Sequence, residues 1–352
     1  MFLLDSHCDT PSHILRLRDL AMDDRYAHVD FPKLKRGGVD GAFFALYVPA
    51  SLSETEAYIH ALKLLEGVRN VLEIHPDKAR LAISSSEAYK NKEEDLFSIF
   101  LGLENGSALG MSLDRVEEFH EAGVRYITLC HSRNNQICDS CAEGGGWNGL
   151  SKFGKDVVKT MNRLGMLVDV SHISDASFYD VLETSTRPVV ATHSCCRAIC
   201  DHPRNMTDEM IKDLAAAGGV IQINFYPLFI DGGFKHVMEQ SGIMEYGERI
   251  ENEFIADPAN PARRAAWNKV QDELNALARP SYRLIADHID HVVSLVGIDH
   301  VGIGSDYDGI EVTPQGMEDI SRMPILFEEL RGRGYTESDL AKIASDNFFR
   351  IL

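Results

Sequence analysis

The sequence has no apolar run long enough to span a membrane, and its N-terminus has no basic region followed by an apolar segment. We therefore expect neither a membrane span nor a secretory signal. Basic residues are also scarce: 35 Lys and Arg against 54 Asp and Glu give a net charge of −19. Such a balance argues against binding to a nucleic-acid backbone or an anionic membrane surface. A small anionic substrate remains compatible, because one well-placed Arg can dominate locally.

Cysteine is sparse and odd in number, with seven residues in the chain: Cys8, Cys130, Cys138, Cys141, Cys195, Cys196 and Cys200. An odd count without a secretory signal favours free thiols and a cytoplasmic location. The spacing of Cys138 and Cys141 is that of a redox pair or half of a structural zinc site, with Cys195 to Cys200 as conceivable partners. One such pair alone is a weak signal for either role.

The chain also lacks a Pro/Gly-rich linker and an evident internal repeat, so its 352 residues predict one domain, 1–352. Eight continuous apolar runs alternate with helical stretches. Such runs are typical of strands covered on both faces. The runs are Leu3–Asp5, Ala42–Val48, Leu96–Leu103, Tyr126–Leu129, Leu167–Val170, Val189–Ala191, Val220–Phe225 and His300–Gly304. This pattern predicts an α/β fold, a (β/α)₈ barrel, with a doubly wound open sheet as the alternative.

Helix boundaries follow from capping signals. Ser53 and Glu56 form a capping box that opens a helix toward Gly67, and Thr336 with Asp339 opens the closing helix. Gly165 ends a helix with apolar residues at helical spacing. Residues 231–280, between the seventh and eighth predicted strands, are mostly charged and helical in pattern. We expect a helical insertion there, either covering a site or contacting a partner, with a solvated loop as the alternative.

Metal-ligating side chains stand at the ends of the predicted strands. His7 and Asp9 follow the first strand, two residues apart, so that both side chains can reach one point. The others are Glu104 after the third, His131 after the fourth, His172 after the fifth, His193 after the sixth, and Asp306 after the eighth. In a barrel these carboxyl ends meet on one face. Imidazoles and carboxylates, one of them shared between two ions, suit a two-metal site.

These residues lie in motifs that resemble the membrane dipeptidase (renal dipeptidase) family of zinc metallopeptidases. The resemblance extends over nearly the whole chain and includes Asp5–Pro11, Gly102–Glu104, Gly123–Ser132, Asp169–His172, Thr192–Ser194, Pro203–Asn205 and Gly304–Gly309. It implies a (β/α)₈ barrel with two zinc ions that hydrolyses dipeptides, often with a D-residue at the C-terminal position. The metal-binding residues match the family pattern.

Position by position, the resemblance implies that His7 and Asp9 bind one Zn²⁺ and that His172 and His193 bind the other. Glu104 and a water or hydroxide would bridge them. His131 would lie at the substrate carbonyl, Arg204 would pair with the free carboxylate of the substrate, and Asp306 would transfer protons. We add Tyr226, just after the seventh strand, as a substrate-binding candidate.

The physical roles are consistent with these assignments. A water shared by two zinc ions has a pKa near neutrality, His131 can donate to a developing oxyanion, and Asp306 can carry a proton. The planar guanidinium of Arg204 matches a carboxylate, although the same residue could cap the helix that starts near Thr207. Asp308 competes with Asp306, but Gly309 indicates that a turn has begun there.

His288 and His291 share one face of an apolar-periodic helix, and we expect them to be structural. Two other functions stay open. One is a different barrel hydrolase, such as a deaminase, a lactonase or an acyl-amino-acid hydrolase. The other is a non-catalytic, zinc-containing ligand-binding barrel. The expected partner is a small dipeptide, and the sequence leaves the choice between monomer and homodimer open.

Overall fold

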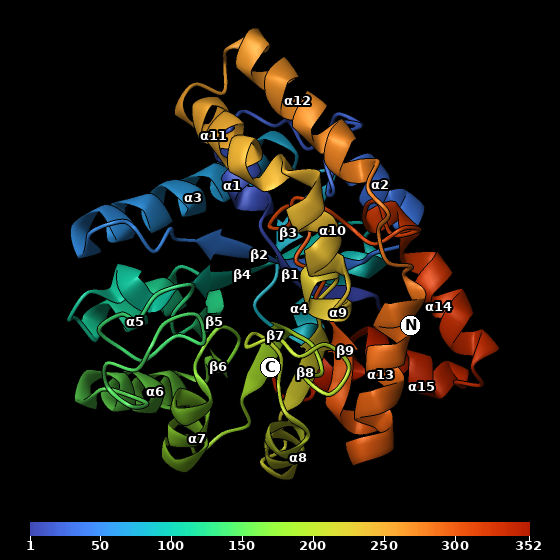
Figure 1. Ribbon diagram of the computed structural model, residues 1–352. Helices are drawn as coiled ribbons and strands as arrows, with labels where there is room; N and C mark the ends of the chain where they lie inside the picture. The colour runs from blue at the N-terminus through green and yellow to red at the C-terminus, as the bar shows by residue number, and fades with distance from the viewer.

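The computed structural model describes residues 1–352, and its centre is a nearly closed barrel of parallel strands (Figure 1). Eight strands follow one another around it in chain order: β1 (Leu4–Cys8), β2 (Gly41–Tyr47), β4 (Phe97–Glu104), β5 (Val124–Thr128), β6 (Leu167–Asp169), β7 (Val190–Ser194), β8 (Val220–Ile223) and β9 (Val301–Ile303). The predicted (β/α)₈ barrel is therefore confirmed. A ninth strand that the sequence did not predict, β3 (Ala79–Leu81), pairs with β4 outside this path.

The barrel closes between its first and last strands just beyond the end of β9. The Asp9 amide donates to the carbonyl of Tyr307 at 2.8 Å, and the Asp306 amide donates to the carbonyl of His7 at 3.0 Å. The residues after β9 thus lie beside the end of β1. This closure brings the first and last metal-ligating motifs of the sequence together.

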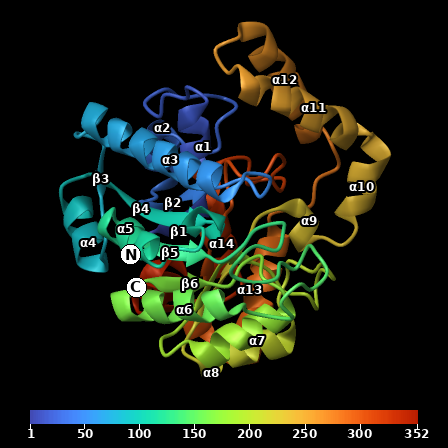
Figure 2. The same cartoon turned by 90° about the vertical axis from the view of Figure 1, so that its left-hand side faces the viewer.

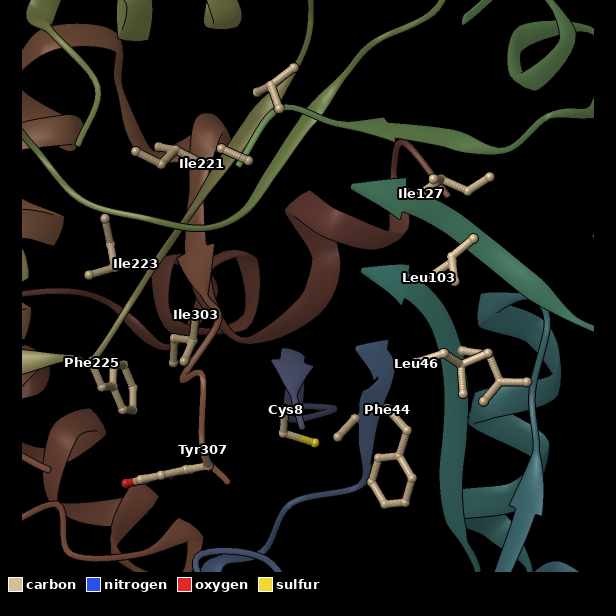
Figure 3. Packing of buried hydrophobic residues seen from close by; sticks show 14 of the residues in the cluster. Cys8, Phe44, Leu46, Leu103, Ile127, Ile221, Ile223, Phe225, Ile303 and Tyr307 are labelled. Carbon is tan, nitrogen blue, oxygen red and sulfur yellow. The ribbon is translucent and has the colours of Figure 1, made fainter. Parts of the chain in front are cut away.

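The strands are apolar on both faces because one face packs inside the barrel and the other packs against the surrounding helices. A small inner cluster fills the barrel and includes Phe43 and Phe100, whose rings are stacked 4.8 Å apart. Phe348, near the C-terminus, packs against Phe43 at 5.0 Å. The larger outer layer lies between strands and helices, and Figure 3 shows part of it, including Phe44 and Ile303. Neighbours such as Phe43 and Phe44 belong to different layers, as the alternation of a strand requires.

The helices surround the barrel (Figure 1) and mostly begin where capping residues predict. Ser53 and Thr336 form capping boxes, and Gly165 ends its helix with a φ of 78°. Gly67 does not end its helix, because it lies against Ile14 and Leu15 of α1 and the helix continues to Ile74. The helices before the insertion are α1 (Thr10–Leu15), α2 (Phe31–Gly37), α3 (Glu54–Ile74), α4 (Ser85–Glu93), α5 (Asp114–Glu121), α6 (Lys152–Leu164), α7 (Asp175–Thr184), α8 (Asp208–Ala216) and α9 (Pro227–Ile230).

Five α-helices lie between β8 and β9, and three of them project from the barrel (Figure 2): α10 (Phe234–Ser241), α11 (Ile243–Ala256) and α12 (Pro261–Asn275). They pack on one another around a small apolar cluster of their own, with Trp267 and Phe254 among its buried members. The chain ends with α13 (Arg283–Val296), α14 (Met323–Gly332), α15 (Glu337–Ala341) and α16 (Asn347–Phe349). None of the helices is both long and apolar enough to cross a membrane.

Candidate metal centre and active site

Glu104, the last residue of β4, lies at the centre of the converging side chains. Its Oε2 is 3.4 Å from Nε2 of His7. Its Oε1 is 3.2 Å from Nε2 of His172, 3.6 Å from that of His193 and 3.7 Å from that of His131. One carboxylate therefore presents one oxygen to His7 and the other to three imidazoles that follow or end other strands.

Two further carboxylates complete the cluster: Asp9, which follows the first strand of the barrel, and Asp306, which follows the last. Nε2 of His7 is 3.6 Å from Oδ2 of Asp9 and 3.9 Å from Oδ1 of Asp306. In total, four imidazoles and three carboxylates form three overlapping groups in which the candidate ligand atoms lie within 4.8 Å of one another. The structure thus brings together all five predicted metal ligands, as well as His131 and Asp306.

A register shift between β1 and β2 turns the side chain of His7 toward this cluster. The register with β2 shifts between Asp5 and Cys8, so that Leu4 belongs to the inner cluster whereas Cys8, four residues on, belongs to the outer layer. An uninterrupted strand would place both on one face. The shift lets His7 reach the mouth of the barrel beside Asp9.

The ring of His7 is held from behind. Its Nδ1 is 2.8 Å from the hydroxyl of Tyr126, a fully buried side chain on β5. The Tyr126 ring passes over Gly102, where a Cβ would lie 2.1 Å from a ring carbon. Gly102 therefore leaves room for the ring of Tyr126. The hydrogen bond between Tyr126 and Nδ1 fixes the orientation of the His7 ring, as such bonds commonly do for imidazoles that bind metals.

A similar chain of hydrogen bonds orients His193. The Thr192 hydroxyl donates to Oδ2 of Asp169 at 2.7 Å and lies 2.8 Å from Nδ1 of His193. Asp169 also accepts from Thr128 and from the backbone amides of Ser171 and Thr192, so it acts as an acceptor only. The hydroxyl of Thr192 has a single proton, which it donates to Asp169. Toward His193 the same hydroxyl must therefore accept, and the donor is Nδ1–H of His193. The lone pair of Nε2 on His193 then points at the cluster.

Buried charge makes this cluster a site for a cation. Burial, and then the neighbouring carboxylate of Glu104, raise the pKa of Asp9 to about 7. Burial disfavours the charged form of His7, but Glu104 and Asp9 outweigh it and raise its pKa well above the usual value. Burial also lowers the pKa values of His172 and His193 well below the usual range, which keeps their imidazoles neutral. Neutral imidazoles beside crowded carboxylates are the donor set of a divalent metal.

Two unpaired atoms support the same conclusion. Nε2 of His7 and Oδ1 of Asp9 are buried without any hydrogen-bond partner in the protein. Buried polar atoms of this kind are rare unless a water or an ion satisfies them. His7 and Asp9 both belong to the cluster, so the residues present fit a metal ion.

Asp306 and Asp308 have different surroundings, although both have a left-handed backbone with φ of 64° and 65°. Asp306 faces the predicted metal ligand His7 and accepts a 2.8 Å hydrogen bond from Asn224. Burial raises its pKa. Asp308 instead accepts from Arg18 at 2.7 Å and from Thr10 at 2.8 Å. Burial opposes its ionisation, but the charge of Arg18 prevails and holds its pKa well below the usual range.

Gly309 lets Asp9, which follows β1, lie close to Asp306, which follows β9. A Cβ there would lie 2.1 Å from Oδ2 of Asp9 and 2.7 Å from Oδ1 of Asp306. Any side chain at this position would push apart the carboxylates of Asp9 and Asp306. The glycine that marks a turn in the sequence is therefore also a requirement of the site.

A cavity of about 760 Å³ opens above the cluster. Its lining includes His131, Arg204 and Tyr226, the residues that the sequence predicts to contact substrate. The Arg204 guanidinium donates to the carbonyl of His193 at 3.0 Å, while its Nε has no partner. Burial, and then the charge of Arg204, lower the pKa of His131 to about 3, so that this imidazole is neutral. The Tyr226 hydroxyl donates to Glu311 at 2.7 Å.

The remaining candidates lie elsewhere. All seven cysteines are free, and none belongs to a group of potential metal ligands. The idea that Cys138 and Cys141 share a zinc site with Cys195 to Cys200 therefore has no support in the structure. His288 accepts from the amide of Cys196 at 3.1 Å, and His291 lies 2.7 Å from Asp208, so both are held by structural contacts.

Sequence reasoning assigned no role to the residues that orient the ligands. Asp169 and Thr192 belong to the strand-end motifs that carry the family resemblance, and their position beside His172 and His193 was the available signal. Tyr126 also lies in one of these motifs, Gly123–Ser132, but the sequence did not predict its contact with His7, because that contact depends on packing across the barrel.

A parallel barrel that holds such a cluster under an open cavity at the carboxyl ends of its strands is typical of the metal-dependent hydrolases. Comparison with known proteins narrows this class. The family model "Membrane dipeptidase (Peptidase family M19)" matches residues 1–352, so the chain belongs to the membrane dipeptidase family, and the protein is a metallopeptidase of the dipeptidase type.

Known relatives agree with this membership. The chain is similar to dipeptidase verJ of Clonostachys rogersoniana, with 30% identity covering 99% of this chain and 83% of the relative. Dipeptidase aclJ of Aspergillus oryzae is 31% identical over 97% of this chain and 73% of the relative. The solved structure of the probable dipeptidase PvdM from Pseudomonas aeruginosa is 25% identical with a TM-score of 0.85, covering 100% of this chain and 94% of that one. A metallopeptidase from Rhodobacter sphaeroides, solved with a phosphinate mimic of the dipeptide L-Ala-D-Ala, is 24% identical with a TM-score of 0.82, covering 100% and 98%.

Proposed function

We propose that the protein is a binuclear zinc dipeptidase that cleaves dipeptides with a free C-terminal carboxylate, including those with a C-terminal D-residue. The observation that carries the proposal is the position of Glu104, with one oxygen 3.4 Å from His7 and the other 3.2 Å from His172. A carboxylate between two groups of nitrogen and oxygen ligands is suited to bridging two ions.

His7 and Asp9 would hold one ion, His172 and His193 the other, and Glu104 would contact both. When bound, the two zinc ions would lower the pKa of a shared water and polarise the scissile carbonyl. Asp306, buried beside His7 and held by Asn224, would accept the proton of the attacking water and deliver it to the leaving amine. The neutral imidazole of His131 would donate a hydrogen bond to the oxygen that becomes negative.

Arg204 supports specificity for a free carboxylate. Its side chain is largely buried at the cavity wall, and its Nε is unpaired. A planar guanidinium with free donors binds a carboxylate through two parallel hydrogen bonds. A neutral nucleobase or lactone would leave that buried charge without a partner, which favours dipeptides over the other hydrolase substrates. Tyr226 lines the same cavity and would contact the substrate there.

The relative from Rhodobacter sphaeroides, which binds a mimic of L-Ala-D-Ala, supports acceptance of a D-residue at the C-terminal position. The test is a hydrolysis screen of zinc-loaded protein with matched L-L and L-D dipeptides and their C-terminal amides. We expect turnover of the free acids and little turnover of the amides. A protein that cleaves lactones or deaminates nucleobases but leaves all dipeptides intact would contradict the proposal.

A further inference from the structure

One wall of the active-site cavity is cationic, although the chain as a whole carries a net charge of −19. Arg16, the residue that follows α1, and Lys63 of α3 line the cavity, and the imidazole of His60 on α3 lines it beside them. His60 and Lys63 are three residues apart on one helix and therefore lie on one face. Arg16 has one ion-pair partner, Glu251 of α11, which places a single oxygen 3.4 Å from the guanidinium.

This cationic wall lies across the barrel from Arg204. The helix α3 follows β2, whereas Arg204 follows β7, and four steps separate these two strands in the eight-strand order. In a barrel of eight strands, four steps lead to the opposite side. The cavity thus has Arg204 at one wall, the metal-binding side chains at its floor, and the cationic group of α1 and α3 at the other wall.

A dipeptide bound in the proposed way has only one orientation in this cavity. Its C-terminal carboxylate would lie at Arg204 and its peptide bond above Glu104, so its N-terminal residue extends toward α1 and α3. Leu15, Tyr47 and Pro49 also line the cavity, and the aliphatic part of a substrate side chain can pack against them.

The cations of this wall are only partly neutralised. Arg16 has one ion pair, the long contact with Glu251, and Lys63 has no ion pair within the chain. Burial lowers the pKa of His60, and so do the charges of Lys63 and Arg16, which shows that the three side chains share one electrostatic environment. An additional negative charge placed among them would be favourable.

We propose that the preferred substrates are dipeptides whose N-terminal residue has an acidic side chain, which Lys63 and Arg16 bind. This inference rests on the proposed dipeptidase function and adds the class of its substrate. Glutamate fits better than aspartate, because its longer stem packs on Leu15 and Tyr47 before its carboxylate reaches the cations.

The test compares three dipeptides that differ only at the N-terminal residue: Glu, its neutral isostere Gln, and Lys, each followed by the same C-terminal residue. A hydrogen bond to a charged partner is worth roughly ten- to a hundred-fold in binding. We expect kcat/KM for the Glu dipeptide to exceed that for the Gln dipeptide by about ten-fold or more, with the Lys dipeptide the poorest.

The variant Lys63→Glu should abolish the preference for the Glu dipeptide over the Gln dipeptide and should raise kcat/KM for the Lys dipeptide relative to both. Lys90→Glu is the matched control, because Lys90 on α4 is exposed and does not line the cavity. Equal kcat/KM for the Glu and Gln dipeptides would overturn the acidic preference and leave the dipeptidase intact. Failure to cleave any of the three, or any dipeptide of the wider screen, would overturn both.

Discussion

The guanidinium of Arg18 donates a 2.7 Å hydrogen bond to the carboxylate of Asp308, and both side chains are almost completely buried. Asp306, only two residues earlier, faces the metal-binding side chains instead. We therefore expect separate tasks for the two aspartates of this short segment: Asp308 fixes the segment to the N-terminal part of the chain, and Asp306 takes part in the reaction.

The first prediction separates these tasks. Asp306→Asn should lower kcat by roughly two to four powers of ten, because it removes the proton carrier, while KM and zinc content change little. Asp308→Asn should instead lower the free energy of unfolding by about 3 kcal/mol, because it leaves the buried charge of Arg18 unpaired. Steady-state kinetics and denaturant unfolding measure the two effects.

The double variant Arg18→Met, Asp308→Asn is the control, and it should recover part of the lost stability because no charge then stays buried. If Asp308→Asn kept wild-type stability but lost turnover, while Asp306→Asn remained active, the assignment would be reversed.

The second prediction concerns metal content. The purified, zinc-loaded protein should contain about two ions per chain, and His172→Ala should lose mainly one of them. Thr192→Val should weaken zinc affinity roughly ten- to a hundred-fold, because the hydroxyl no longer fixes the tautomer of His193. Thr192→Ser keeps the hydroxyl and should stay near wild type. Elemental analysis and competition with a chelator measure these values, and a single ion per chain after zinc loading would exclude the two-ion arrangement.

The third prediction concerns Arg204. Arg204→Lys should lower kcat/KM for free dipeptides, since an ammonium cannot reproduce the two parallel hydrogen bonds of a guanidinium. The same variant should discriminate less between a dipeptide and its amide than the wild type does. Parallel assays of both substrates provide the measurement. Equal wild-type rates on the free and amidated dipeptides would show that Arg204 does not bind the carboxylate.

The fourth prediction concerns pH. Burial lowers the pKa of His28 to about 4 and that of His288 to about 4, and in each ring Nδ1 accepts a hydrogen bond from a backbone amide that protonation would break. Between the usual pKa near 6.5 and these values, the unfolded chain binds protons that the folded chain does not. Stability should therefore fall as the pH drops through this window, by at most about 3 kcal/mol for each histidine.

Urea unfolding at a series of pH values tests this dependence. His28→Gln and His288→Gln should each flatten the curve between about pH 6.5 and 4. Unchanged slopes in both variants would show that other groups are responsible.

The sequence by itself determined the elements and the chemistry at their ends. Continuous apolar runs such as Ala42–Val48 indicated strands buried on both faces, and the barrel has a strand there at Gly41–Tyr47. Capping residues such as Ser53 and Thr336 marked helix starts, because these signals lie within one turn of the chain. The candidate metal ligands could likewise be predicted from their positions just after successive strands, since parallel strands in a barrel bring their carboxyl ends to one face.

Only the tertiary structure decided how those residues meet. The register shift between β1 and β2, the hydrogen bond between Tyr126 and His7, and the pairing of Arg18 with Asp308 all join segments distant in sequence. Local patterns carry no information on such contacts, because they depend on the closure of the barrel and on the packing of side chains across it. The same reason explains why Gly67, a helix stop by local propensity, lies inside α3: its contact with α1 outweighs the preference.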